Sequence, residues 1–272
     1  MKNTSFALLC FAGSALAFTS PSSHAAAFVD EVISYTPGSG VGSYTNPDAA
    51  LGQPGDNTGF GLLTPFNPHF STSELARIGS GGELTLRFSN EVLIGDGLDI
   101  GIYTNVFLIN NSSLTGAQDP AASFGGDSVD IHVSDNGNDW VSVDTSTIPF
   151  NLPHTYYLNP EALTGSSSTV PSNPILADFG KPFDAELSDF DGLTYAGIGN
   201  LLDGSAGGTW LDLSPTGLSS VSYIRFNNPG ATFELDTVAI ANSKVGVLVP
   251  EPHSVMGLAA TGLLVFQRRR SA

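Results

Sequence analysis

Short apolar stretches with alternating polar residues recur along this chain of 272 residues, and turn-forming residues separate them. From Glu83 to Phe88, leucine or phenylalanine occupies every second position, which is the spacing of a β-strand with one buried face. The 31 glycines and 17 prolines favour many turns over long helices. The pattern therefore predicts an all-β domain in which two sheets pack as a jelly-roll β-sandwich.

A β-hairpin is the clearest local signal and covers residues 128–145. Val129, Ile131 and Val133 alternate with polar residues, and the pair Asn136-Gly137 is typical of a tight turn before the partner strand. Further strands are expected at 100–108, with a break near residue 104, and at 210–213, 221–226 and 233–240. Short helices are expected at 46–51 and 194–202, and long loops at 112–124 and 145–174.

The strand expected at 233–240 needs an irregularity to bury its apolar side chains together. Phe233 and Leu235 share one parity, whereas Val238 and Ile240 share the other. A β-bulge near residues 236–237 would place all four on one face of the sheet.

The same hairpin carries a family resemblance. Residues 129–140 are similar to the V-x-V-S-x-D-G-x-x-W hairpin of discoidin-like, galactose-binding-like jelly rolls. Residues 223–226 and 233–236 resemble the closing strands of that family, and residues 46–52 resemble its first loop. The resemblance implies a sandwich fold. The pattern departs at a long insert around 145–205, so the ligand-binding residues stay unknown.

The C-terminus has the layout of a membrane-directed tail. The segment Val249-Pro250-Glu251-Pro252 precedes an apolar run, and Arg268, Arg269 and Arg270 follow it. Arginines resist translocation and stay on the cytoplasmic side. The 15 residues 253–267 would form a helix about 22 Å long, against about 30 Å of hydrocarbon. The tail is therefore expected to be a temporary anchor.

Together these features resemble the PEP-CTERM sorting signal of bacterial surface proteins. The resemblance implies an exosortase, a membrane cysteine protease or transpeptidase, that acts near Pro250-Glu251-Pro252 after transient membrane retention. The alternative is a proline-rich linker to an ordinary C-terminal anchor.

The N-terminus has the features of a secretory signal peptide. Lys2 precedes an apolar run at 6–18, and small residues allow cleavage after Ala25 or Ala27. The expected organisation is a signal peptide at 1–27, one β-sandwich domain at 28–248, and a sorting signal with its hydrophobic helix at 249–272.

Composition excludes several classes of protein. The single cysteine, Cys10, lies in the signal peptide, so neither disulfides nor cysteine-bound zinc are expected in the exported domain. Four of nine basic residues but only one of 26 acidic residues lie in the tails, which leaves five basic and 25 acidic side chains. A net charge of about −20 opposes binding to nucleic acid.

Motifs for catalysis are missing from the sequence. It contains no Gly-x-Ser-x-Gly, no phosphate-binding glycine loop and no His-Glu-x-x-His. His69, His132 and His154 are scattered, and His132 beside Asp130 is expected to be solvated. No catalytic residue is predicted, and the protein is expected not to be an enzyme.

Calcium is the one candidate cofactor, because acidic turns can present several oxygens to a hard cation. Asp189 and Asp191 flank a phenylalanine before a glycine, and Asp135 and Asp139 flank the tip of the hairpin. Neither pair matches an EF-hand loop. Their ordinary role would be turn formation and solubility.

These observations predict an exported, non-catalytic protein of the cell surface or extracellular matrix, with exopolysaccharide as its candidate partner. Two alternatives remain: a secreted polysaccharide-active enzyme with a carboxylate pair, and a purely structural matrix component without a ligand. Trp140 and Trp210 are expected to fill the core, whereas Tyr156 and Tyr157 lie in a loop.

Overall fold

The computed structural model describes residues 27–110, 121–125, 128–164 and 167–248. The signal-peptide prediction, apart from Ala27, falls outside the described residues. So do the sorting motif Val249-Pro250-Glu251-Pro252 and the basic residues Arg268, Arg269 and Arg270. Within the described ranges, no helix combines the length and the apolar character needed to cross a membrane.

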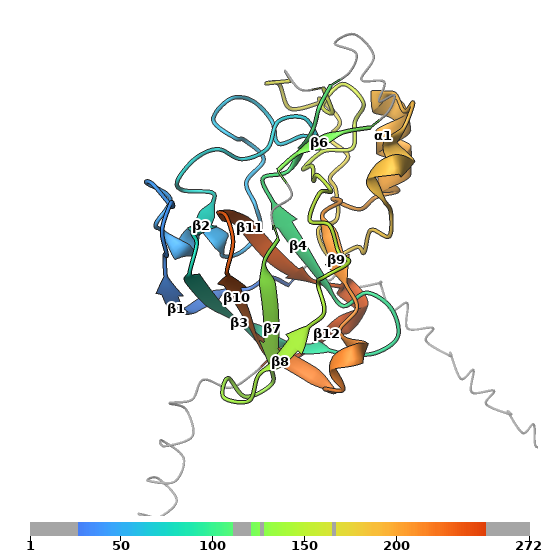
Figure 1. The fold of residues 1–272 in the computed structure, drawn as a ribbon. Helices are drawn as coiled ribbons and strands as arrows, with labels where there is room; N and C mark the ends of the chain where they lie inside the picture. Colours follow the sequence, from blue (N-terminus) through green and yellow to red (C-terminus); the bar gives the residue numbers. More distant parts are fainter. Residues whose placement is uncertain (1–26, 111–120, 126–127, 165–166, 249–272) are drawn as a thin grey trace, which may run out of the picture.

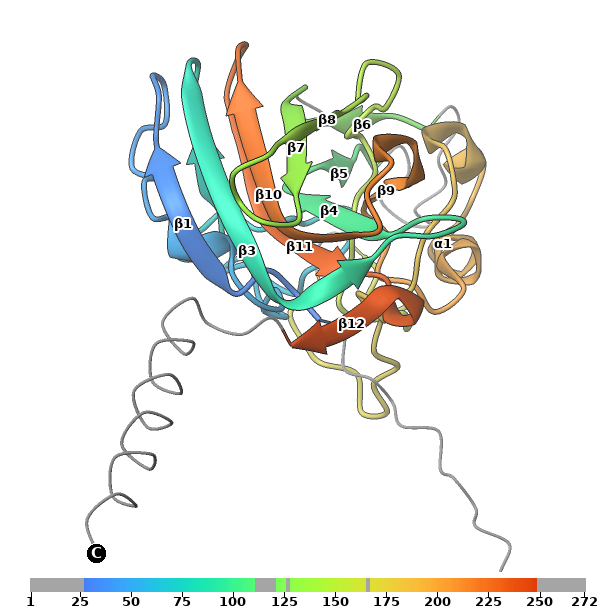
Figure 2. The same cartoon turned by 90° about the horizontal axis from the view of Figure 1, so that it is seen from below.

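Antiparallel strands form two main sheets (Figure 1), and the neighbouring strands of the larger sheet lie side by side in Figure 2. The larger sheet has the order β1 (Glu31–Thr36), β3 (Gly82–Leu93), β10 (Ser220–Asn228), β7 (Asp130–Ser134) and β8 (Val141–Val143), and β12 (Val245–Leu248) also pairs with β3. The smaller sheet has the order β2 (Ala76–Ile78), β11 (Phe233–Ile240), β4 (Ile100–Thr104) and β9 (Thr209–Leu211). A separate ribbon pairs β5 (Phe107–Leu108) with β6 (Ser123–Phe124).

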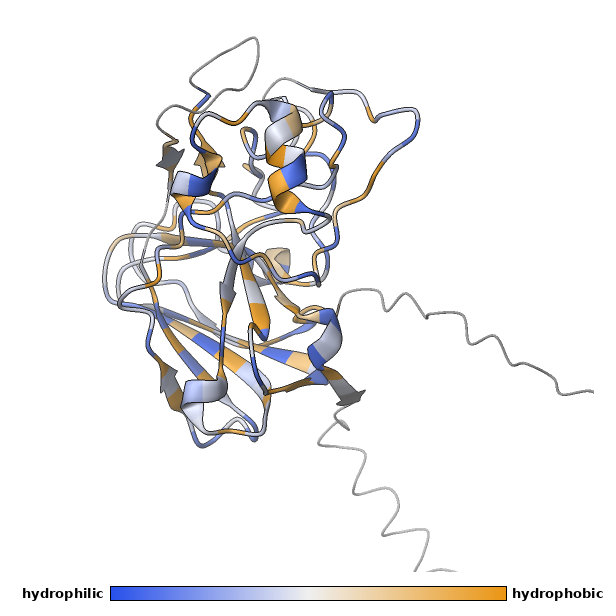
Figure 3. Ribbon diagram, turned by 90° about the vertical axis from the view of Figure 1, so that its right-hand side faces the viewer, coloured by the Kyte–Doolittle hydropathy of each residue, from blue (hydrophilic) through white to orange (hydrophobic). Residues whose placement is uncertain are grey.

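The two main sheets pack face to face, so the predicted β-sandwich is confirmed. The chain passes from one main sheet to the other at most connections, which is the path of a jelly roll and is consistent with a discoidin-like sandwich. Apolar residues alternate with polar ones along the strands (Figure 3). Their buried side chains, such as Leu86, Ile131, Ile224 and Leu235, form one continuous core between the sheets.

The predicted hairpin is present as β7 and β8, with Ile131 opposite Val143 and Val133 opposite Val141. Its turn depends on Gly137, which has a φ of 76° and lies against the ring of Tyr223. The expected break near residue 104 is also present, because β4 ends there and β5 begins three residues later.

The predicted bulge in β11 is confirmed. The pairing of β11 with β4 shifts register between Leu235 and Thr237. As a result Phe233, Leu235, Val238 and Ile240 all belong to the core between the sheets. The bulge therefore lets two pairs of apolar residues with opposite parity face the same side of the sheet. Asp236 lies at this irregularity, so its side chain does not follow the regular alternation of the strand.

The long insert, which includes α1 (Tyr195–Leu202), covers the outer face of the smaller sheet (Figure 1). A second apolar cluster fills this interface and includes Tyr103, Phe179, Ile198 and Trp210. The smaller sheet is thus buried on both faces. The short helices are α1 (Tyr195–Leu202), η1 (Pro47–Ala50), η2 (Leu187–Phe190), η3 (Ser214–Thr216) and η4 (Asn242–Lys244).

One of the aromatic expectations needs correction. Trp210 is buried as expected, but Trp140 is only half-buried and lies beneath the guanidinium of Arg225, 3.8 Å from the ring centroid. Tyr157 is a core residue whose hydroxyl donates a hydrogen bond to Asp56, and Tyr156 packs on Phe179. The loop aromatics are therefore used for packing.

Candidate functional site

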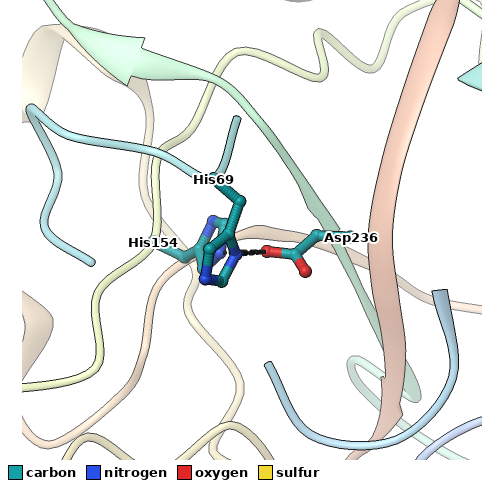
Figure 4. Close-up of side chains that lie close together, drawn as sticks. All are labelled: His69, His154 and Asp236. Carbon is teal, nitrogen blue, oxygen red and sulfur yellow. Dashed lines mark hydrogen bonds and ion pairs between the residues drawn. The ribbon is translucent and has the colours of Figure 1, made fainter. Parts of the chain in front are cut away.

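Three polar side chains from distant segments meet beneath the insert (Figure 4). Asp236 Oδ2 accepts a hydrogen bond from His69 Nδ1 at 2.7 Å and another from His154 Nε2 at 2.8 Å. All three residues are buried. We call this group the His-Asp-His cluster.

Each member reaches the cluster through a local feature of the backbone. Asp236 occupies the bulge of β11, which turns its side chain toward the insert. His154 is held by a backbone bridge to Gly207, whose φ of 88° and close approach to the Pro153 carbonyl leave no space for a side chain. His69 belongs to the loop between η1 and β2, and its ring is completely buried.

Aromatic side chains surround the cluster. The ring of His154 contacts Tyr103 edge to face at 5.3 Å between centroids, and Phe179 at 6.3 Å. Both aromatics belong to the second apolar cluster. Because the three side chains are buried, their ionic groups interact more strongly than they would at the surface.

The charges of the cluster support one another. Burial alone would raise the pKa of Asp236, but the positive charge of His69 and the two histidine hydrogen bonds hold that pKa below its ordinary value. Burial alone would lower the pKa of His69, but Asp236, Glu74 and the carbonyl of Gly55 together raise it. Burial raises the pKa of the nearby Glu74 carboxyl. His69 and Asp236 therefore each favour the charged form of the other.

Polar atoms on the outer sides of the cluster lack hydrogen bonds. His69 Nε2, His154 Nδ1 and Glu74 Oε2 are buried without a partner in hydrogen-bond geometry. The nearest charged group to His69 Nε2 is Glu74 Oε1 at 3.9 Å. Buried groups of this kind are rare in proteins and call for an explanation. Beside the cluster lies a cavity of about 110 Å³, lined by Asp236, Glu74, Gly55 and Asp48 among others.

One donor atom from each member lies within 4.8 Å of the others, and among the described residues this is the one group of three or more potential metal ligands. The sequence analysis missed it, because Asp236 is 167 positions from His69 and 82 from His154, and no short motif links them. The one sequence signal was the bulge expected at 236–237. His132, by contrast, is half-buried on β7 beside Asn227.

The residues predicted to bind calcium lie elsewhere, at exposed turns. Asp189 accepts a hydrogen bond from the backbone of Glu186 at the start of η2, and Asp191 accepts one from Ala121. Asp139 accepts a hydrogen bond from the side chain of Asn136, and Asp135 is exposed beside it. Each pair stands apart from the His-Asp-His cluster, and calcium binding there stays a prediction.

The insert also forms one side of an open groove of about 460 Å³. The buried side chains of Trp210 and Phe183 lie at its floor, Ile148, Pro149 and Leu187 supply partly exposed apolar surface, and Asn151, Asp184 and Glu186 supply polar groups. Both carboxylates are exposed at its rim. Pockets of about 300–1,000 Å³ are the size that accommodates small ligands.

Fold and tail together define an exported β-sandwich protein with a removable C-terminal signal. A comparison with protein families identifies residues 248–271 as a PEP-CTERM protein-sorting motif. This motif marks the chain as a substrate of an exosortase-type system, anchored transiently in the membrane before processing. No curated protein matches the chain.

Proposed function

We propose that the protein is a non-catalytic component of the cell surface or extracellular matrix that contacts exopolysaccharide through the groove beside the insert. The sorting motif at residues 248–271 carries the proposal, because it directs the chain to an exosortase-type system. The motif match begins at the last residue of β12, so the sandwich itself is the cargo that is sorted.

The groove supports the glycan part of this proposal. Ile148, Pro149 and Leu187 are at least partly exposed there and offer apolar surface to a sugar ring, and Asn151 with the rim carboxylates offers hydrogen bonds to hydroxyl groups. The exported domain carries a net charge of about −20 by the residue count above, and Asp184 and Glu186 add negative charge at the rim. Like charges repel, so a neutral polysaccharide is the expected partner.

The enzyme alternative has a weaker basis. Glu74 and Asp236 lie near each other and have pKa values shifted in opposite directions, as an acid and base pair would. Their cavity of about 110 Å³ is smaller than the pockets of about 300 Å³ or more that hold small ligands. Both carboxyl groups also face His69. We therefore assign the carboxyl groups of Glu74 and Asp236 a structural role.

The test is affinity electrophoresis of the purified protein in gels that contain neutral or uronic-acid polysaccharides. We expect retardation by a neutral glycan, and about tenfold weaker binding after Asp184→Ala or Asn151→Ala, the equivalent of one hydrogen bond. Glu161→Ala is the matched control, because Glu161 is exposed and lies outside the groove. Migration unchanged by every glycan would favour the purely structural alternative, and release of soluble sugars would favour the enzyme.

A further inference from the structure

We propose that the His-Asp-His cluster is a structural binding site for a divalent transition metal, with Zn²⁺ as the expected ion. The ligands would be His69 Nδ1, His154 Nε2 and the carboxylate of Asp236. This site is independent of the glycan-binding groove.

The type of ligand decides the class of metal. Imidazole nitrogens suit zinc and its neighbours in the first transition series, whereas calcium and magnesium prefer sets made entirely of oxygen. Two imidazoles and one carboxylate, with water as the fourth ligand, are a zinc ligand set known from enzymes, and the same donor types meet here in a buried, structural setting. The cavity of about 110 Å³ beside Asp236 has room for that water.

The geometry needs only a small adjustment. Tetrahedral zinc with bonds of about 2.0–2.2 Å places its donor atoms about 3.3 Å apart. The two nitrogens lie 2.7 and 2.8 Å from Asp236 Oδ2, so each would move outward by about half an ångström. His69 comes from a loop without strand pairing at that point, so this side chain has the most freedom to make the adjustment.

The surroundings provide the second support. A metal-bound histidine carries its proton on the other ring nitrogen and commonly donates it to a carboxylate or carbonyl. For His69 that nitrogen is Nε2, and the nearest carboxylate oxygen, Glu74 Oε1, is 3.9 Å away. The backbone of Gly55 also interacts with the His69 ring.

The function of this metal would be to fasten three segments. It would connect the loop that carries His69 and the insert that carries His154 to β11 in the centre of the smaller sheet. The sandwich domain contains no cysteine, because Cys10 is the one cysteine of the chain. A metal site would therefore provide the cross-linking that disulfides often provide in exported proteins.

The experiment uses the purified full-length protein, stripped with a chelator and reloaded with Zn²⁺ alone. Native mass spectrometry should show one zinc per chain, and the melting temperature should rise with added zinc. His69→Ala and His154→Ala should each weaken binding by about 100-fold or more, and Glu74→Gln by about tenfold. His132→Ala is the matched control and should keep full stoichiometry.

A measurement on the wild-type protein guards against variants that fail to fold. X-ray absorption at the zinc edge should show two imidazoles and oxygen at about 2.0–2.2 Å. A shell without imidazole, an absence of zinc uptake, or equal loss of zinc in His132→Ala would overturn the proposal. In the first two cases the cluster would be a hydrogen-bonded clamp without metal.

Discussion

Asp236 and His69 lie 167 positions apart, and a buried hydrogen bond of 2.7 Å joins their side chains. Asp236 belongs to the central part of the smaller sheet, and His69 belongs to a loop that has no strand pairing at that point. The bond therefore fixes the loop onto the sheet. His154 adds a second connection from the insert through the same carboxylate oxygen.

Removing the charge of Asp236 should destabilise the fold strongly. Asp236→Asn leaves His69 without its counterion in a buried site, and breaking a buried ion pair costs about 3–5 kcal/mol. Urea unfolding in the presence of a chelator measures this effect apart from any metal. Asp130→Asn, on the exposed side of β7, should change the free energy of unfolding by less than about 0.5 kcal/mol. A similar small change in Asp236→Asn would show that the ion pair contributes little.

The sandwich was predictable because its signals are local. Alternation in β3 and β7, the Asn136-Gly137 turn and the parity change in β11 each concern residues that are neighbours in the chain. A β-bulge leaves a trace in the sequence because it changes the parity of buried positions. That trace located Asp236 at a special position without showing its partners.

The site was not predictable because its contacts are long-range. His69 and His154 looked unremarkable in isolation, and only the packing of the insert on the smaller sheet brings them to Asp236. For Trp140 the error was the reverse: its position after the hairpin turn suggested a role in the core that the structure does not give it. The strand register instead places Arg225 over its exposed face.

The Arg225 and Trp140 pair should contribute measurable stability to the hairpin. The guanidinium lies 3.8 Å from the ring centroid, and Arg225 also donates a hydrogen bond to Thr85. A double-mutant cycle with Arg225→Lys and Trp140→Leu should give a coupling of about 0.5–1 kcal/mol, because lysine loses the planar stacking. Chemical denaturation of the four proteins measures it. Additive effects of the two changes would argue against the interaction.

Gly101 should not tolerate a side chain. A Cβ atom at this position of β4 would lie 2.7 Å from Trp210 Cε2, in an interface buried between sheet and insert. Gly101→Ala should therefore lower the free energy of unfolding by about 1–3 kcal/mol through overpacking. Gly230→Ala is the control, since the nearest atom to its Cβ is 3.8 Å away. Equal thermal stability of the two variants would contradict this packing.

Tyr157 should make the protein sensitive to alkaline pH. Burial, together with the hydrogen bond to Asp56, raises the pKa of Tyr157 from 10.0 to about 12. The folded state thus holds the phenol proton more tightly than the unfolded state. The resulting stability is complete below pH 10 and is lost as the pH rises from 10 toward 12.

The variant Tyr157→Phe tests this expectation. It should be less stable than the wild type by about 1–3 kcal/mol at neutral pH, because the bond to the Asp56 carboxylate is lost. The difference should shrink between pH 10 and 12, where the wild-type tyrosine ionises. Denaturation curves across this range would refute the assignment if the difference stayed constant.

The sorting motif should control the fate of the whole chain. Pro250-Glu251-Pro252 sets one acidic side chain between two prolines within the matched sorting motif. Replacing these three residues with alanine removes the acidic side chain and both prolines and should block cleavage. The retained tail would then increase the mass of the mature protein and shift it to the membrane fraction. Ser243→Ala, which is exposed and lies outside the matched motif, should leave mass and fractionation unchanged. The same result for the triple-alanine variant would refute a role for the motif in processing.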